Sequence, residues 1–352
     1  MSIENVKTYY GQTLTQSADL KTDACCTDAA PPRHVAQAIA GVHETVKMRY
    51  YGCGIAIPSR LEGLKVLDLG SGSGRDAYAL AKLVGPNGSV TGVDMTPEQL
   101  AVAREHEQWH ADAYGYDKPN TRFIEGYLEK LDELDLEPES FDLIISNCVI
   151  NLCEDKPAVF KAAHKLLKPG GELYFADVYS DRRVPQELTK DPILYGECLS
   201  GALYWSDFLA IAKQSGFADP RTVTHRPLAL LDPQIKAMLS PIRFASVTTR
   251  LFKLTDADTA CEDYGQAVIY KGGVEGMENV FELDVEHRIE KGRVFPVCGN
   301  TAAMLMKTRF ASYFELLGDG QTHFGPFPGC AAPDVFAGNQ EAASAAPVGG
   351  CC

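Results

Sequence analysis

The sequence predicts an α/β protein built on a seven-stranded, largely parallel sheet with helices on both faces. Two observations predict this fold. Between residues 64 and 178, short apolar runs typical of buried strands alternate with segments of helical periodicity. The first of these runs leads directly into a glycine-rich turn. A helical segment precedes the sheet domain, and an insert and a smaller β-rich unit follow it.

The strands and helices are expected in regular alternation. The expected strands are 66–69, 90–93, 122–124, 141–146 and 172–178, and the helices between them are 76–84, 97–114 and 156–167. An earlier helix is expected at 35–46, after Pro31 and Pro32. A helical insert at 192–215 and apolar runs at 222–231 and 244–254 follow, and these runs are expected to complete the sheet with an antiparallel hairpin.

The chain of 352 residues is long enough for two or three domains. We expect a helical N-terminal cap, a core, an insert that also completes the sheet, a β-rich unit and a disordered tail rich in glycine, alanine and proline. Their boundaries are 1–60, 61–180, 181–264, 265–325 and 326–352.

Charge and hydropathy exclude several classes of protein. The net charge of −14 argues against a surface for nucleic acid or anionic membranes, because binding phosphates needs a basic face. No apolar window reaches the length of a membrane span, and the first residues carry no export signal. We therefore expect a cytoplasmic protein. In a reducing cytosol, the eleven cysteines are more compatible with buried or reactive thiols than with a disulfide framework.

The glycine-rich turn discriminates between two kinds of ligand. Gly70, Gly72 and Gly74 alternate after the first strand, and Asp94 ends the second strand, where a carboxylate can bind a ribose diol. A dinucleotide fingerprint would need glycine at position 75, where the chain has Arg75. The segment DLGSGSG instead resembles the first motif of class I S-adenosylmethionine methyltransferases, which have a Rossmann-like fold. Lysine, proline and two glycines at 168–171 resemble the entry to the fifth strand of the same class.

Three cysteines occur where such a protein holds its substrate. Cys148 follows the fourth strand, at the edge where open α/β sheets bind ligands. Cys53 lies in a glycine-flanked bend, and Cys198 lies in the insert after the fifth strand. Three thiolates suit a soft, three-coordinate centre such as trivalent arsenic, whose lone pair is a nucleophile toward a methylsulfonium group.

Longer stretches resemble one family, the arsenite S-adenosylmethionine methyltransferases. The resemblance is strong over residues 1–254 and extends to about 310, where a β-rich unit resembles the C-terminal extension of the family. The stretches are TYYGQTL, LKTDACC, RYYGCGIAIP, VLDLGSGSGRD, SNCVINL, GGELYFADVYSDRRVP, YGECLSGALYW and RFASVTTRLFKL.

The resemblance implies four functional cysteines: Cys25, Cys53, Cys148 and Cys198. Cys26 is an alternative to Cys25, although the spacing from the LKT stretch favours Cys25. Arsenite or methylarsenite, delivered as a thiol adduct, is expected to bind Cys148 and Cys198, with Cys53 as the third ligand. Methylation oxidises arsenic, so protein thiols are expected to return it to the trivalent state, leaving a Cys25–Cys53 disulfide that thioredoxin or glutathione reduces.

For S-adenosylmethionine, the resemblance and the strand positions predict a set of binding residues. They are Gly70, Ser71 and Gly72 for the amino-acid end, Asp94 for the ribose, Met95 for the adenine face, Gly126, Tyr127 and Leu128 for the adenine edge, Tyr51 and Asn147 for the methionine part, and Asp68 for the glycine turn or the amino group.

Two other functions share part of this pattern. A methyltransferase for an organic acceptor would have the same fold but would not need Cys53, Cys148 and Cys198 together. A thiol protein that only sequesters arsenic would not need the S-adenosylmethionine motifs. Equilibrium binding separates the three, because only an arsenite methyltransferase should bind both ligands. We expect this protein to act as a monomer that has no nucleic-acid or membrane partner.

Overall fold

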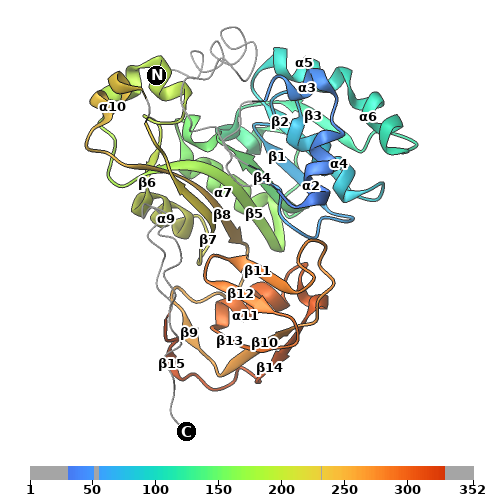
Figure 1. Cartoon of the computed structure of the whole chain (residues 1–352), viewed down its shortest axis with the longest axis vertical. Coiled ribbons are helices and arrows are strands. Elements are labelled where there is room, and N and C mark those ends of the chain that lie inside the picture. Colours follow the sequence, from blue (N-terminus) through green and yellow to red (C-terminus); the bar gives the residue numbers. More distant parts are fainter. Residues whose placement is uncertain (1–30, 51–54, 231, 330–352) are drawn as a thin grey trace.

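The computed structural model describes residues 31–50, 55–230 and 232–329. They form an α/β domain and, beneath it in Figure 1, a smaller unit made by the C-terminal part of the chain. Within these ranges no helix combines the length and the apolar composition needed to cross a membrane.

The α/β domain is built on one mixed sheet with the order β3-β2-β1-β4-β5-β8-β7 (Figure 1). The first five strands are parallel, and β8 lies antiparallel between β5 and β7. The strands are β1 (Lys65–Leu69), β2 (Ser89–Asp94), β3 (Thr121–Glu125), β4 (Phe141–Asn147), β5 (Leu167–Ser180), β7 (Arg221–Pro227) and β8 (Phe244–Phe252). A short strand, β6 (Leu203–Tyr204), pairs with β5 and adds an eighth member to the predicted seven.

Helices cover both faces because the inner strands are apolar on both sides. Leu67 and Leu69 of β1 pack into one buried cluster, and Val66 packs into the other. The helices over the two faces are α2 (Arg33–Ala40), α4 (Arg75–Val84), α5 (Pro97–Glu105), α6 (Glu107–Tyr114), α7 (Lys156–Leu166) and α9 (Trp205–Gln214). The predicted class of fold, a Rossmann-like methyltransferase sheet, is therefore confirmed.

One predicted helix is two helices in the structure. Instead of a continuous helix over 97–114, α5 ends at Glu105 and α6 begins at Glu107. The imidazole Nδ1 of His106 lies 2.8 Å from the carbonyl oxygen of Val102. In a continuous helix, that oxygen would accept the hydrogen bond of the His106 backbone N–H. The His106 backbone N–H bonds to the carbonyl oxygen of Ala103 instead, and the helix breaks there.

The predicted N-terminal helix and the predicted insert helix are also interrupted. Gly41 ends α2, and a short helix, α3 (Glu44–Lys47), follows it. In the insert, α8 (Pro192–Gly196) and α9 are separated by a turn that contains Cys198. Cys198 has a φ of +62°, a left-handed conformation that a right-handed helix cannot continue through.

The smaller unit contains a three-stranded sheet, two strand pairs and one helix that the sequence did not predict. That helix, α11 (Gly299–Met306), packs against the sheet. The strands are β9 (Glu262–Asp263), β10 (Gln266–Tyr270), β11 (Val280–Asp284), β12 (His287–Glu290), β13 (Val294–Val297), β14 (Phe314–Leu317) and β15 (Gly325–Pro326). Most of the expected disordered tail lies outside the described residues.

Buried charges join the two units at the amino edge of the sheet. Glu172 on β5, which pairs with Leu143 of β4, is fully buried between two guanidinium groups. Its oxygens lie 2.6 Å from Nε of Arg250 on β8 and 2.5 Å from Nη2 of Arg309 in the smaller unit. Arg250 also donates to the carbonyl oxygen of Leu283 on β11 at 2.5 Å. Burial alone would raise the pKa of Glu172, but the two arginines lower it below its usual value.

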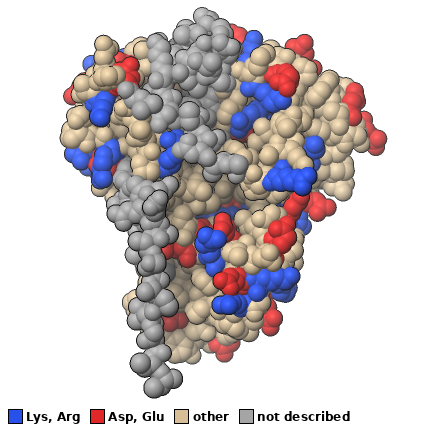
Figure 2. Space-filling view, viewed as in Figure 1, with Lys and Arg blue, Asp and Glu red and all other residues tan. Residues whose placement is uncertain are grey.

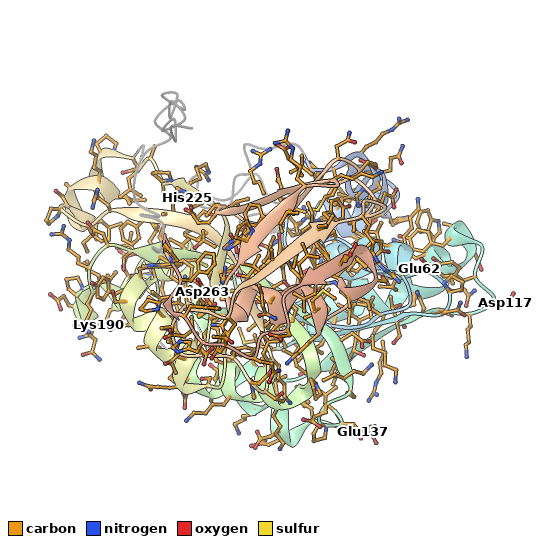
Figure 3. All side chains as sticks on the ribbon, turned by 90° about the horizontal axis from the view of Figure 1, so that it is seen from below. Glu62, Asp117, Glu137, Lys190, His225 and Asp263 are labelled. Atoms are coloured by element: carbon orange, nitrogen blue, oxygen red, sulfur yellow. The ribbon has the colours of Figure 1, made fainter. Side chains whose placement is uncertain are left out.

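The surface carries charges of both signs. On the face shown in Figure 2, basic and acidic side chains occur side by side over both units. Seen from below, the smaller unit lies in front of the α/β domain, with Asp263 near the centre and Asp117 and Lys190 toward opposite ends of the molecule (Figure 3). The described residues of the smaller unit therefore cover the amino edge of the sheet and do not cover the carboxyl edge.

Candidate functional site

The glycine turn between β1 and α4 brings backbone close to the carboxyl edge of the sheet. The backbone N–H groups of Gly70 and Ser71 donate to the carbonyl oxygen of Val93 at 2.8 and 3.1 Å. Gly70 has a φ of +75°, and a Cβ added there would lie 2.5 Å from a methyl group of Val149. Any side chain at position 70 would therefore clash as well as strain the turn.

Asp94 at the end of β2 is oriented by the backbone. Its carboxylate accepts hydrogen bonds from the N–H of Gly72 at 2.9 Å and from the N–H of Thr96 at 2.8 Å. Burial raises the pKa of Asp94, and these donors partly offset the increase. Because Asp94 lines the cavity, its carboxylate can also accept hydrogen bonds from the hydroxyls of a ligand.

Three carboxyl groups gather beside the turn. Asp68, Asp76 and Asp94 all line the same cavity. Burial, followed by the negative charges of Asp76 and Asp94, raises the pKa of Asp68 well above its usual value. Among the described residues, no group hydrogen-bonds to Oδ2 of Asp68, although this atom is buried. A ligand with a positive charge and N–H donors would satisfy it.

A tyrosine and an arginine close the cavity on the side of the N-terminal segment. The guanidinium carbon of Arg75 lies 3.1 Å above the ring centroid of Tyr50, and Nη2 of Arg75 is 2.5 Å from Asp76. The amide nitrogen of Asn147 donates to the Tyr50 hydroxyl at 2.5 Å and to Asp76 at 3.1 Å. This network connects the end of β4 to the start of α4.

The cavity itself has an empty volume of about 980 Å³, part of which is open to solvent. Its floor is formed by the carboxyl ends of β1, β2 and β4, where open α/β sheets bind their ligands. This size and this mixture of apolar and acidic lining suit a nucleoside that carries a cationic amino-acid tail.

Cys148 and Cys198 come together beside this cavity. Cys148 follows β4 directly, lines the cavity and has a φ of +58°. The sulfur of Cys198 donates to the carbonyl oxygen of Cys148 at 3.3 Å. Both side chains are buried, and the Cys148 sulfur is in a disulfide bond. Two non-glycine residues with left-handed backbones, both cysteines and in contact, are typical of functional sites that store local strain.

Asp177 is the third member of this cluster. One of its oxygens and the two sulfurs, of Cys148 and Cys198, all lie within 4.8 Å of one another. Asp177 accepts hydrogen bonds from the backbone N–H and the side-chain amide of Asn151, at 3.0 and 2.7 Å, and from the N–H of Val178 at 2.9 Å. Burial raises the pKa of Asp177 to about 7 despite these donors.

Most of the residues predicted for the cofactor lie around one cavity. Those that line it are Asp68, Gly70, Ser71, Gly72, Asp94, Met95, Gly126, Leu128 and Asn147. Cys148, predicted as an arsenic ligand, lines it too. Tyr127, between two lining residues, does not line it. Cys198 is buried next to Cys148, behind the cavity wall. Cys25, Tyr51 and Cys53 lie outside the described residues.

Several lining residues were not predicted. Tyr50 and Arg75 line the cavity, and so do Thr96, Gln99 and Glu129. Asp177 was missed although it lies on a predicted strand. Its position on β5, one residue beyond the partner of Asn147, places it at the same edge as Cys148, and the alignment of parallel strands could have indicated this.

Comparison with known proteins agrees with this geometry. Residues 61–216 match the methyltransferase-domain family, and residues 264–352 match the arsenite methyltransferase C-terminal domain. The arsenite methyltransferase of Aquipseudomonas alcaligenes is 55% identical over 93% of this chain and 94% of its own length. The human arsenite methyltransferase is 45% identical over 88% of this chain and 82% of its own length.

A solved structure shares the fold. The crystal structure of the arsenic(III) S-adenosylmethionine methyltransferase of Chlamydomonas reinhardtii aligns with a TM-score of 0.82 at 48% identity, covering 85% of this chain and 100% of that one. Together with the identity to the curated relatives along most of their length, this shows that the chain belongs to the arsenite methyltransferase family.

Proposed function

We propose that this protein transfers the methyl group of S-adenosylmethionine to trivalent arsenic bound by Cys148 and Cys198. The products are mono- and dimethyl arsenicals, and a third methylation would give the trimethyl product. The biological role is arsenic detoxification. The observation that carries the proposal is the contact between two buried cysteines, at the carboxyl edge of the sheet, beside a cavity suited to the methyl donor.

The residues of the cavity fit S-adenosylmethionine. The Asp94 carboxylate can accept hydrogen bonds from the ribose hydroxyls. The buried Oδ2 of Asp68 needs a donor, which the cationic amino-acid end would provide. The glycine turn leaves room that a Cβ at Gly70 would fill. S-adenosylmethionine supplies an electrophilic methyl group on a positively charged sulfur, and the nearby carboxylates favour that charge.

The thiols fit arsenic as the substrate. Once the disulfide of Cys148 is reduced, the thiolates of Cys148 and Cys198 can hold trivalent arsenic as a soft centre and leave its lone pair unshared. Because Cys148 both holds the substrate and lines the cavity, it can place that lone pair toward the methyl group. No general base is required at arsenic, so proximity and alignment provide most of the acceleration. An organic acceptor would not use this thiol pair.

The redox part of the cycle involves further thiols. Each methylation oxidises arsenic from the trivalent to the pentavalent state, and two thiols return the two electrons by forming a disulfide. We assign this disulfide to Cys25 and Cys53, with Cys53 also the third ligand of arsenite, and its reduction to thioredoxin or glutathione. We further propose that the protein acts in the cytoplasm as a monomer.

Product speciation tests this function. Purified protein is incubated with S-adenosylmethionine, a thiol reductant and either arsenite or methylarsenite, and the arsenic species are separated by chromatography with mass detection. The parent should methylate both substrates. Cys53→Ser should lose the methylation of arsenite, which needs three thiols. It should keep that of methylarsenite, which needs two, because the added thiol reductant can supply the two electrons that the Cys25–Cys53 pair no longer returns. Cys261→Ser, at a partly exposed thiol far along the chain, is the control. Equal rates on arsenite for Cys53→Ser and the parent would contradict this division of roles.

Binding of the methyl donor should depend strongly on Asp94. Asp94→Ala should weaken S-adenosylmethionine binding at least about tenfold, because a hydrogen bond to a charged group contributes about 1.5–3 kcal/mol. Titration calorimetry gives the dissociation constant. Glu125→Gln, at the end of the neighbouring strand β3 on an exposed side chain, should bind as the parent does. If Asp94→Ala binds as tightly as the parent, the ribose is held elsewhere.

A further inference from the structure

The cluster beside the cavity contains one group that arsenic methylation does not use. Arsenic(III) prefers thiolates, and the Asp177 carboxylate is a hard oxygen donor within 4.8 Å of both sulfurs. Asp177 is fully buried, and a buried carboxylate is costly unless it has partners. Asn151 and Val178 supply hydrogen-bond partners, and the two nearby sulfurs add the further donors that a second kind of ligand would need.

Hydrogen bonds orient this carboxylate as they orient metal ligands. Oδ1 accepts two bonds, from the Asn151 amide and the Val178 N–H, whereas Oδ2 accepts one, from the Asn151 N–H. A carboxylate oxygen has two lone-pair sites, so Oδ2 retains one for an ion. Outer hydrogen bonds of this kind fix the direction of a ligand and increase metal affinity.

The donor set and the local charge select the ion. Two thiolates and a carboxylate match a thiophilic divalent cation, which takes three protein ligands and a water molecule in tetrahedral geometry. The three ligands carry a charge of −3 when deprotonated. A divalent ion and the nearby ammonium of Lys156, which interacts electrostatically with Asp177 and Cys198, would neutralise it. Near-neutral charge is what a buried site requires.

We propose that, when Cys148 is reduced, a thiophilic divalent cation such as Zn²⁺ or Cd²⁺ binds to Cys148, Cys198 and Asp177 and competes with arsenite. This inference rests on the proposed function, because the two ligands share the same sulfurs. Binding replaces the two thiol protons, and the Asp177 proton where one is bound, by the cation and moves no electrons, so two or three protons are released for each ion. Such an ion would occupy the site when arsenic is absent.

The test is metal binding by the full chain. Cys330, Cys351 and Cys352 are replaced by serine to remove tail thiols, and the protein is reduced with a phosphine and freed of metal. Cd²⁺ is titrated in, and its thiolate charge-transfer absorption gives the dissociation constant; Zn²⁺ and then arsenite are added as competitors. Asp177→Asn is compared with Asp155→Asn, whose asparagine can still cap α7. Binding of S-adenosylmethionine shows that each variant is folded.

Asp177→Asn should weaken Cd²⁺ binding at least about tenfold, while Asp155→Asn leaves it unchanged. Zn²⁺ and arsenite should each displace Cd²⁺ from the parent. The ¹¹³Cd resonance of the parent should have the shift of a mixed sulfur and oxygen site, a result that needs no variant. An all-sulfur shift, equal affinities in Asp177→Asn and the parent, or failure of arsenite to displace Cd²⁺ would overturn the proposal. Loss of arsenite methylation in the metal-free parent, with Cd²⁺ binding intact, would instead contradict the proposed function.

Discussion

Replacing either Cys148 or Cys198 by serine is expected to abolish the methylation of both arsenite and methylarsenite. The two sulfurs lie close together next to the cavity, and in the proposed reaction each substrate needs both of them to be held near the methyl group. Losing the bound geometry converts an aligned reaction into an encounter in solution, which should reduce the rate at least about a hundredfold. Initial rates with each substrate, at saturating S-adenosylmethionine, measure the loss.

Cys153→Ser is the matched control for this loss. Cys153 is also buried and also lines the cavity, but it does not belong to the cluster of Cys148, Cys198 and Asp177. Cys153→Ser changes a sulfur to an oxygen at a position that, like Cys148, is buried and lines the cavity. This variant should keep most of the methylation activity. If Cys148→Ser methylated methylarsenite at the rate of Cys153→Ser, Cys148 would not be a substrate ligand. S-adenosylmethionine binding by all three variants separates loss of chemistry from loss of fold.

The largest expected effect on stability is at Glu172. Glu172→Gln removes the negative charge shared by Arg250 and Arg309 and leaves two buried guanidinium groups facing each other. Breaking one side of a buried ion pair typically costs about 3–5 kcal/mol. Urea denaturation, followed by circular dichroism, should therefore show a much lower midpoint for Glu172→Gln than for the parent.

Two further variants make this result specific. Glu290→Gln removes a carboxylate from an exposed pair with Arg293 and should leave the midpoint unchanged. Adding Arg309→Met to Glu172→Gln removes one of the two unpaired charges and should recover part of the loss. An unchanged midpoint for Glu172→Gln would mean that the buried triad does not hold the two units together.

The strands and the glycine turn could be predicted because their signals are local. The apolar run that ends at Leu69, the alternating glycines and the acid at the end of β2 are adjacent in the sequence, and each restricts its own backbone. The five parallel strands extend beyond their expected limits, which is typical of strand boundaries. By contrast, β7 and β8 end at Pro227 and Phe252, before the expected limits at 231 and 254. The largest extension is in β5, which begins at Leu167.

The helix breaks could not be predicted from periodicity. At His106 the backbone N–H bonds to Ala103, three residues earlier, while the ring nitrogen bonds to the carbonyl oxygen of Val102, and no sequence signature marks that choice. At Cys198 it depends on contact with the turn after β4. In both places a specific contact overrides an apolar pattern that would suit a longer helix.

The site was predicted where a motif contains its residues and missed where only the fold brings residues together. Asp94 and Cys148 belong to recognisable stretches, and both line the cavity. Asp177 joins the cysteines only because β5 lies next to β4 in the sheet. Tyr50 lines the cavity, whereas the sequence pointed to its neighbour Tyr51, which lies outside the described residues.

The position of the smaller unit has a practical consequence. Since β8 runs back toward the start of β5, the chain leaves the α/β domain at the edge opposite the cavity, and the smaller unit packs there (Figure 1). Its exposed turn at Asp319, between β14 and β15, is therefore on the side of the molecule away from the cavity. A peptide tag inserted in that turn would attach the protein to a resin with its cavity facing outward, an arrangement suited to treating arsenic-contaminated water in a flow column.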